Sequence, residues 1–285
     1  MDTPLQEPEI QNFFGIVAMI DALGVSNYSI KECEIFIKDL KEINSETKKF
    51  IEMMIATQKT LKVSGKIDQD ITKIMKNVKT SQFGDTIILA WPLEEKYDSV
   101  NLMIILLVAA NVIGILQKGL IKKIPFRGSI SVGEFVWEDA NARILGPAIS
   151  DANNWYNSTD WFGVIFTPQS NFWLSSHIEN EINTDPNASF LKMLKTFICE
   201  YDDVPLKKSD NSPKKQEKLF VIGWPVVFYW FTPSKLNHKQ IFNQLLFDLS
   251  MPKGTELKFK NTNVFFEWYG KEIFEKDKDR WTLIS

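Results

Sequence analysis

The chain has 285 residues, of which 44% are hydrophobic and 24% charged, and its formal net charge is −3. This balance is typical of a globular protein and gives no reason to expect a nucleic acid or a membrane as a partner. Two cysteines are too few for a disulfide framework, and the acidic N-terminus lacks the basic and apolar pattern of a secretory signal, so we expect a cytoplasmic protein.

The first predicted elements are a buried strand and two helices. The run FFGIVAMI (13–20) is continuously apolar and has the length of a central strand. The next helix is expected to begin at Ser29, because Ser29 and Glu32 have the spacing of a capping box. A second helix is expected over 46–62.

A hairpin and a long apolar segment follow. The stretches 76–82 and 86–91 are expected to be strands, joined tightly by the turn at 83–85. The apolar stretch 102–116, interrupted by Asn111, is shorter than the ~20 residues that span a bilayer. We therefore expect a buried helix there rather than a membrane span.

The next strand is expected at 125–137, and Pro147 suits the first turn of the helix after it. The order β-α-α-β-β-α-β-(β)-α over 13–157 predicts an α+β fold of the ferredoxin-like (βααββαβ) type, with an antiparallel sheet.

The remainder, 161–285, is expected to add strands and helices to a single domain covering 1–285, whose core is 10–160. Four further elements and one loop are predicted there from their composition. They are strands at 163–168 and 218–231, helices at 187–201 and 234–250, and a lysine-rich, mobile loop at about 205–218.

Two aspartates stand at the ends of apolar strands. Asp21 ends the first strand and Gly24 follows it in a turn, while Asp85 lies in the hairpin turn. If the strands are neighbours, both carboxylates meet at one point, where a divalent cation would relieve their repulsion. The alternative is that each aspartate is only a turn or cap residue.

Three stretches together resemble a known family. MIDALGVS and SQFGDTIILAWP are similar to the two metal-binding stretches of class III nucleotidyl cyclases, and FRGSISVGEF followed by RILGPAISDANNWYNS resembles their next strand and helix. Their order, without the usual adenylyl or guanylyl signature, looks most like the pyrimidine cyclases of bacterial Pycsar anti-phage systems. The resemblance covers residues 10–160.

The resemblance implies two Mg²⁺ or Mn²⁺ ions per site, held by Asp21, Asp85 and the backbone carbonyl of Ala22. It also implies a head-to-tail homodimer with the active sites at its interface. The turn implied to cradle the triphosphate through backbone N–H groups comprises Leu23, Gly24, Val25 and Ser26.

The chain departs from the family where the transition state is stabilised. The asparagine and arginine of the family helix are replaced by Ser150 and Asn154, and Asn154 carries no positive charge. Arg127 is the candidate replacement, with Lys258 and Lys260 as weaker ones. The alternative for Arg127 is a structural salt bridge.

The base pocket also departs from the purine enzymes. The positions that the resemblance assigns to base reading are occupied by Ser81 and Arg143. Arginine only donates hydrogen bonds, which suits O2 and O4 of uracil better than the amine of cytosine, so UTP is favoured over CTP. The alternative is that Arg143 points into solvent.

The main hypothesis is therefore a uridylate cyclase that makes 3′,5′-cyclic UMP as an anti-phage signal read by a separate effector protein. The alternatives are a cytidylate cyclase, a purine cyclase with an unusual pocket, and a degenerate cyclase fold that only binds nucleotide. A diguanylate cyclase is disfavoured, because QFGDTI lacks that family's Gly-Gly-acid-Glu-Phe turn.

Overall fold

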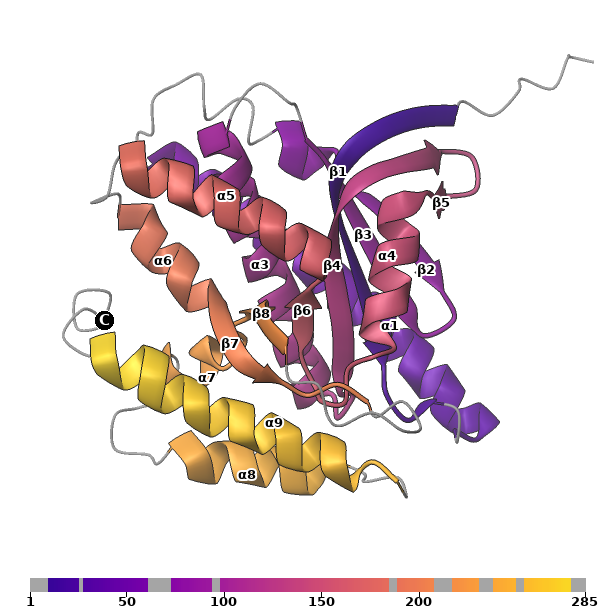
Figure 1. The fold of residues 1–285 in the computed structure, drawn as a ribbon. Coiled ribbons are helices and arrows are strands. Elements are labelled where there is room, and N and C mark those ends of the chain that lie inside the picture. Colours follow the sequence, from indigo (N-terminus) through magenta and orange to yellow (C-terminus); the bar gives the residue numbers. More distant parts are fainter. Residues whose placement is uncertain are drawn as a thin grey trace, which may run out of the picture.

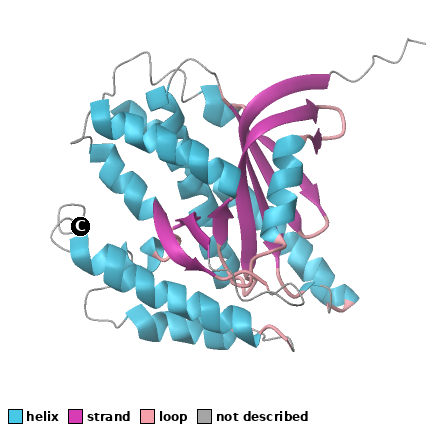
Figure 2. Ribbon diagram, viewed as in Figure 1, coloured by secondary structure: helices cyan, strands magenta, loops and turns pink. Residues whose placement is uncertain are grey.

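The computed structural model shows an α+β protein built on one long mixed sheet with helices packed against it (Figures 1 and 2). The residues that the structure describes are 10–25, 28–60, 73–93, 98–184, 189–207, 217–230, 238–249 and 254–277.

The elements alternate along the chain. The strands are β1 (Ile10–Ala22), β2 (Lys79–Phe83), β3 (Thr86–Pro92), β4 (Phe126–Glu138), β5 (Arg143–Leu145), β6 (Val164–Phe166), β7 (Ile198–Val204) and β8 (Glu217–Ile222). The helices are α1 (Ile30–Thr60), α3 (Asp98–Ile121), α4 (Pro147–Tyr156), α5 (Pro168–Thr184), α6 (Ser189–Phe197), α7 (Val226–Trp230), α8 (His238–Asp248) and α9 (Glu256–Tyr269). A short π-helix, Gly270–Phe274, and a 3₁₀ turn of helix, Glu275–Asp277, follow α9.

The sheet order confirms the predicted fold class. The strands run β2-β3-β1-β4-β6-β8-β7, with β5 added beside β4. The first four form the antiparallel order of a ferredoxin-like sandwich. β6 then lies parallel to β4, and β8 and β7 continue the sheet in antiparallel fashion. The C-terminal part of the chain thus extends the same sheet.

The central strand β1 separates two cores. Ile16 and Ile20 point to the face covered by α1 and α3 and are fully buried. Val17 and Met19 point to the opposite face, which α4 covers (Figure 1). Because side chains alternate along a strand, Asp21 belongs to the α4 face.

Helix α3 is the predicted buried helix. Its segment Leu102–Ile121 has a mean hydropathy of 2.1 and is long and apolar enough to cross a membrane by length and composition, yet 78% of its most apolar stretch is buried inside the protein. It packs against α1, α5, α6 and the sheet. A helix that is apolar all round is what such a central position requires.

The N-terminus of α1 confirms the predicted capping box. The Ser29 backbone N–H donates to the Glu32 carboxylate at 2.7 Å, and the Glu32 N–H donates to Ser29 Oγ at 3.4 Å. The helix then runs without interruption to Thr60, so the separate helix expected over 46–62 is wrong at its start. The described sequence has no Gly or Pro in this stretch that would end the helix.

Two boundaries in the C-terminal part also differ from expectation, and a third prediction there is mostly untested. The helix expected over 187–201 ends at Phe197, and its last residues form strand β7. The strand expected over 218–231 ends at Ile222, and Val226–Trp230 is helical. The loop expected at about 205–218 lies mostly outside the described residues.

Helix α9 was not predicted, and it anchors the C-terminal part through aromatic packing. Phe265 meets Trp161 edge-on with ring centroids 4.8 Å apart, and Trp161 stacks on Tyr201 at 5.9 Å. All three side chains are nearly inaccessible to solvent. This packing fixes the segment just before β6, and with it Asp160.

Candidate active site

The two predicted metal-binding aspartates lie at the ends of neighbouring strands, Asp21 near the end of β1 and Asp85 in the turn before β3. Asp21 stands opposite Thr86 of β3 and opposite Arg127 of β4 in the ladders. Asp85 lies in the β2–β3 turn directly before Thr86, and the Ala22 N–H donates to its backbone carbonyl at 3.2 Å. The hairpin prediction is confirmed, and it brings Asp85 next to the end of β1.

The Asp21 carboxylate is nearly buried, with 8% of the residue exposed. Thr86 Oγ1 donates to Oδ1 at 3.0 Å, and Arg127 donates to Oδ2 from Nε and from Nη2, both at 3.2 Å. Burial raises the pKa of Asp21 above its ordinary value, and nearby Asp85 raises it further, while the bonds from Thr86 and Arg127 act in the opposite direction. Burial is therefore the main reason why the charged form of this carboxylate is disfavoured, although Arg127 pairs with it.

Arg127 is held in place from the other side by the end of α4. Its Nη2 also donates to Asn157 Oδ1 at 3.2 Å, and its guanidinium carbon lies 5.3 Å from the centroid of the Tyr156 ring. Only 11% of its side chain is exposed. The guanidinium thus packs against the Tyr156 ring and is paired with Asp21 at the end of β1.

Two lysines from the C-terminal part approach the same point. Lys258 of α9 forms an ion pair with Asp160 at 3.2 Å, with each side chain 14% exposed. The side chain of Lys207 is exposed to solvent over much of its surface, but protein atoms around its ammonium partly desolvate it, and this desolvation, together with the charges of Arg127 and Lys258, lowers its pKa. We call Asp21, Arg127, Asp160, Lys207 and Lys258 the strand-end cluster.

The charges of the strand-end cluster are unevenly matched. Asp21 pairs with Arg127 and Asp160 pairs with Lys258. Within the described part of the chain, Lys207 makes no ion pair, although the charges of Asp21 and Asp160 reach it. A cation left beside two ion pairs is available to an anionic ligand.

The donor set fits a hard divalent cation. Asp21, Asp85 and the Ala22 carbonyl offer oxygen ligands, and Mg²⁺ commonly combines one or two carboxylates with water and substrate phosphate. No cluster of three or more acidic, histidine or cysteine side chains is found among the described residues. The Arg127 guanidinium already occupies one edge of Asp21 and would share or yield it.

The predicted phosphate turn is partly engaged with the protein itself. Gly24 adopts a φ of 89°, which favours glycine, and so allows the sharp turn after β1. The Leu23 N–H donates to the Pro125 carbonyl at 2.9 Å and is therefore committed. Val25 also lies in this turn, and Ser26 lies outside the described residues.

Ser150 and Asn154 lie one helical turn apart on α4, and both are exposed. The opposite side of α4 packs on the sheet: the Ala152 carbonyl accepts a bond from Ser129 at 2.6 Å, and Asp151 accepts one from Ser131 at 2.9 Å. The two predicted transition-state positions consequently face away from the sheet that carries Asp21.

Ser81 and Arg143 are not brought together within the chain. Ser81 lies level with Met19 across the sheet, whereas Arg143 pairs with Glu138, opposite Ile10. The nine residue-to-residue steps from Ile10 to Met19 (19 − 10) correspond to roughly 30 Å along the strand. The Arg143 side chain is 71% exposed, 3.5 Å from Glu138, which matches the solvent alternative within one chain.

Several site residues were missed from the sequence. Thr86 directly follows a predicted metal aspartate, so the hairpin register could have identified it. Tyr156 and Asn157 end the helix predicted from Pro147, and its length would have indicated them. Lys207 had no local signal, because only the tertiary fold places it beside Arg127. Lys260, a weaker candidate, is exposed.

No family model matches the sequence, and a search of the curated proteins finds no relative. Solved structures with some likeness include three guanylyl cyclases. The catalytic core of a rhodopsin-guanylyl cyclase with converted specificity, in complex with ATPαS, has 12% identity and a TM-score of 0.39, covering 75% of this chain and 98% of that one.

The guanylyl cyclase Cya2 has 8% identity and a TM-score of 0.39, covering 75% of this chain and 92% of that one. The guanylate cyclase domain of RhGC from Catenaria anguillulae, in complex with GTP, has 14% identity and a TM-score of 0.34, covering 74% and 97%. At these values the assignment of a function rests on the residues of the site.

Proposed function

We propose that this chain is a nucleotidyl cyclase that converts UTP into 3′,5′-cyclic UMP and pyrophosphate. The observation that carries the proposal is the placement of Asp21 and Asp85 at adjacent strand ends, with Arg127 on Asp21 and the strand-end cluster beside them. A carboxylate pair next to clustered cations suits a triphosphate with divalent cations.

Cyclisation joins the ribose 3′-oxygen to the α-phosphorus and breaks the bond between the α-phosphorus and the oxygen that bridges it to the β-phosphorus. Pyrophosphate leaves with that oxygen, and the proton of the 3′-hydroxyl goes to solvent. Asp21, Asp85 and the Ala22 carbonyl are the proposed ligands of two Mg²⁺ or Mn²⁺ ions. Bound divalent cations lower the pKa of the attacking hydroxyl and neutralise the phosphates.

The protein's own cations have two proposed tasks. Arg127 turns from Asp21 towards the triphosphate and spreads positive charge over its oxygens, which replaces the charge that Asn154 lacks. Lys207 binds the terminal phosphates as a point charge. The N–H groups of Gly24 and Val25 are proposed to complete the cradle, with Leu23 engaged elsewhere.

The active unit is proposed to be a homodimer. Ser150 and Asn154 are exposed on the outer face of α4, and Arg143 is exposed at the far end of β4 from Asp21. A second copy could present these positions to the site, so that Ser150 and Asn154 contact ribose and Arg143 reads the base together with Ser81. UTP is then favoured, because arginine donates to both uracil carbonyls.

The biological role that we propose is an anti-phage signal, with the cyclic nucleotide read by a separate effector protein. It derives from the likeness of the sequence to Pycsar pyrimidine cyclases. A defence role predicts that cells producing the active protein and its effector resist phage, and that the Asp85→Asn variant gives no resistance.

The deciding experiment incubates the purified protein with ATP, GTP, CTP or UTP and Mn²⁺, and identifies products against 3′,5′-cyclic standards. Cyclic UMP alone supports the full proposal. Cyclic CMP retains the pyrimidine cyclase and removes the role of Arg143. Cyclic AMP or GMP leaves a purine cyclase, and no product from any nucleotide, with binding retained, leaves a degenerate fold.

A further inference from the structure

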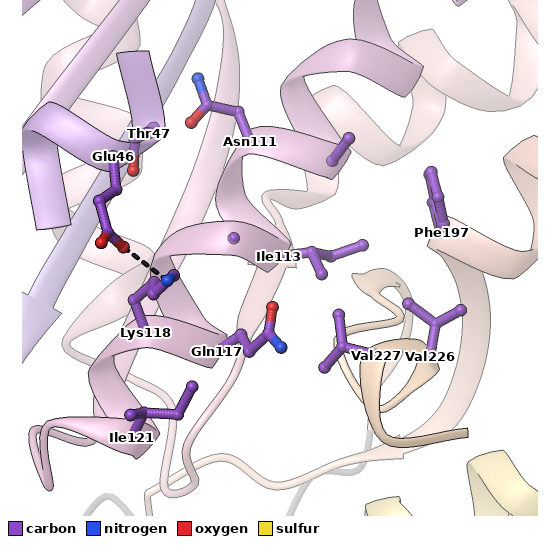
Figure 3. A pocket seen from close by; sticks show the side chains of 12 residues that line it. Glu46, Thr47, Asn111, Ile113, Gln117, Lys118, Ile121, Phe197, Val226 and Val227 are labelled. Carbon is purple, nitrogen blue, oxygen red and sulfur yellow. Dashed lines mark ion pairs between the residues drawn. The ribbon is translucent and has the colours of Figure 1, made fainter. Parts of the chain in front are cut away.

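A cavity of about 410 Å³ lies between α1, α3 and α7, on the face of the sheet opposite to Asp21 (Figure 3). Two charged residues are among those that line it, Glu46 and Lys118, and they pair with each other at 2.6 Å. Apolar side chains such as Ile113 and Val227 form another wall. The residues that line this cavity therefore offer no unpaired cation, and the phosphates of a nucleotide are better matched to the strand-end cluster.

Within that cluster, the guanidinium of Arg127 is shared between two elements. Nε and Nη2 donate to Asp21 Oδ2, and Nη2 also donates to Asn157 Oδ1, each at 3.2 Å. Each terminal nitrogen of arginine carries two hydrogens, so Nη2 can serve both acceptors at once. If the bonds to Asp21 break, the bond to Asn157 and the packing on the Tyr156 ring still hold the guanidinium.

The amide of Asn157 is oriented for this contact. Its Nδ2 donates to the backbone carbonyl of Asn153 at 3.2 Å, one turn earlier on α4. This bond commits the NH2 end of the amide to the helix and leaves Oδ1 for Arg127. Asn157 is exposed and lies at the C-terminal cap position of α4, so its side chain does not fill the core. A substitution here therefore tests the contact with Arg127 without opening a cavity.

The turn after α4 is fixed by the C-terminal part of the chain. The Lys207 N–H donates to the Ser158 carbonyl at 2.8 Å, and the Asp160 N–H donates to the Pro205 carbonyl at 2.9 Å. Helix α9 binds the same turn, because Asn261 Nδ2 donates to the Asp160 carbonyl at 2.8 Å. The end of α4 is thus held by segments that extend the ferredoxin-like core.

We propose that Asn157 is a positioning residue for Arg127, and that the C-terminal part of the chain acts on the site by fixing Asn157 in place. This role rests on the proposed function, in which Arg127 leaves Asp21 for the triphosphate. During that movement the guanidinium stays bonded to Asn157 Oδ1 and packed on Tyr156. A side chain that is already held loses less conformational freedom when it binds a substrate.

The position of Arg127 can be followed by NMR without any turnover. Arg127 is one of three arginines in the sequence, so arginine labelled with ¹⁵N gives three Nε–H signals, and the Arg127→Lys variant identifies the one that is lost. Asn157→Ala is expected to speed the exchange of the Arg127 Nε–H with water about 3–10-fold, because one hydrogen bond of the guanidinium is gone. Asn153→Ala is the matched control, since it removes another exposed side chain of α4 but keeps the carbonyl that Asn157 uses.

Steady-state kinetics give the functional readout. Asn157→Ala is expected to lower kcat about 3–10-fold with a smaller change in KM, because Arg127 is needed most in the transition state. Its melting temperature should stay close to that of the unchanged protein, as is usual for an exposed side chain. Asn261→Ala should change the exchange rate and kcat in the same direction, because α9 then holds the turn less firmly.

An unchanged Arg127 Nε–H exchange rate in Asn157→Ala, or an equal acceleration in Asn153→Ala, would overturn the positioning role. Faster exchange with a normal kcat would also overturn it, because the reaction would then not depend on how the guanidinium is held. If Asn261→Ala changes neither quantity, the C-terminal part does not act through this turn. A protein that forms no cyclic nucleotide fails the proposed function, whereas the exchange rates still decide whether Asn157 holds Arg127.

Discussion

Arg127 clasps Asp21 across the β1–β4 ladder, donating from Nε and Nη2 to the same oxygen, Oδ2, at 3.2 Å. In this arrangement the guanidinium bonds an oxygen of Asp21 that a metal ion would also bind. The alternative considered from the sequence, a structural salt bridge, is therefore present. It is compatible with the proposed contact between Arg127 and the triphosphate, whose negative charges would compete with Asp21 for the guanidinium.

The aspartates can be tested by isosteric changes. Asp21→Asn and Asp85→Asn are expected to lower turnover by about 10²–10³-fold or more, because a neutral amide binds divalent cations poorly. The fold should persist, since an asparagine oxygen at position 21 can still accept from Thr86. Asp139→Asn, at the opposite end of β4, is the matched control, and full activity in either test variant contradicts the metal pair.

The substitution Arg127→Lys tests whether the reaction needs only a positive charge at this position or also the planar arrangement of donors in the guanidinium. Lysine keeps the positive charge but lacks the second donor, Nε, that bonds Asp21, and it lacks the planar group that lies over the Tyr156 ring. Pyrophosphate release is expected to fall by about 10²-fold, with a smaller change in melting temperature. If lysine supports normal turnover, the planar fork has no catalytic task and Arg127 is only structural.

Lys207 is predicted to bind the phosphates. Lys207→Gln should raise KM for the nucleoside triphosphate about tenfold and leave kcat less affected, because a charge-assisted contact to a phosphate is lost. Lys218→Gln is the control, since Lys218 pairs with Glu200 on the neighbouring hairpin strand. Equal effects of the two changes would indicate a general charge effect rather than a contact.

The Asp160–Lys258 pair is expected to be structural. Lys258→Met alone should lower the free energy of unfolding by about 3–5 kcal/mol, because it leaves Asp160 charged and nearly buried. Adding Asp160→Asn should recover much of this loss. If the double variant unfolds normally but is inactive, Lys258 contributes directly to the reaction.

Alkaline pH should destabilise the C-terminal packing. Burial raises the pKa of Tyr201 to about 12, from an ordinary value of 10.0. The folded state therefore holds the phenol proton more tightly than the unfolded state does, and stability is lost as pH rises from 10 to 12, by about 2–3 kcal/mol for this group. Urea unfolding across this pH range measures the loss, and Tyr201→Phe should reduce it; an equally steep decline in that variant would contradict the assignment.

The ferredoxin-like core could be predicted because its signals are local. The apolar run of β1, the capping box at Ser29 and the hairpin at Asp85 each depend on neighbouring residues. Together they were enough to place Asp21 beside Asp85. The C-terminal boundaries were missed because ICEY continues the apolar pattern of α6, and only pairing with β8 makes it a strand.

The rest of the site depends on long-range geometry. Lys207 reaches Arg127 only because β6, β7 and β8 extend the sheet past β4. The side chains of Ser81 and Arg143 are suited to hydrogen-bonding a nucleotide base, but the distance between them depends on the register of the strands, which could not be predicted from the sequence. Asn111 was noted as an interruption of an apolar stretch, and its unpaired state became visible only with the packing around α3.

The residues of the strand-end cluster are synthesised at widely separated times. Asp21 and Lys258 are 237 positions apart (258 − 21). At synthesis rates of about 5–20 residues per second, a ribosome needs roughly 12–47 s to travel between them. For the last 98 of these positions (258 − 160), or about 5–20 s, the growing chain carries Asp160 without its partner from α9. The cluster is consequently completed only after α9 has been synthesised, and a chain that stops before α9 would not carry it.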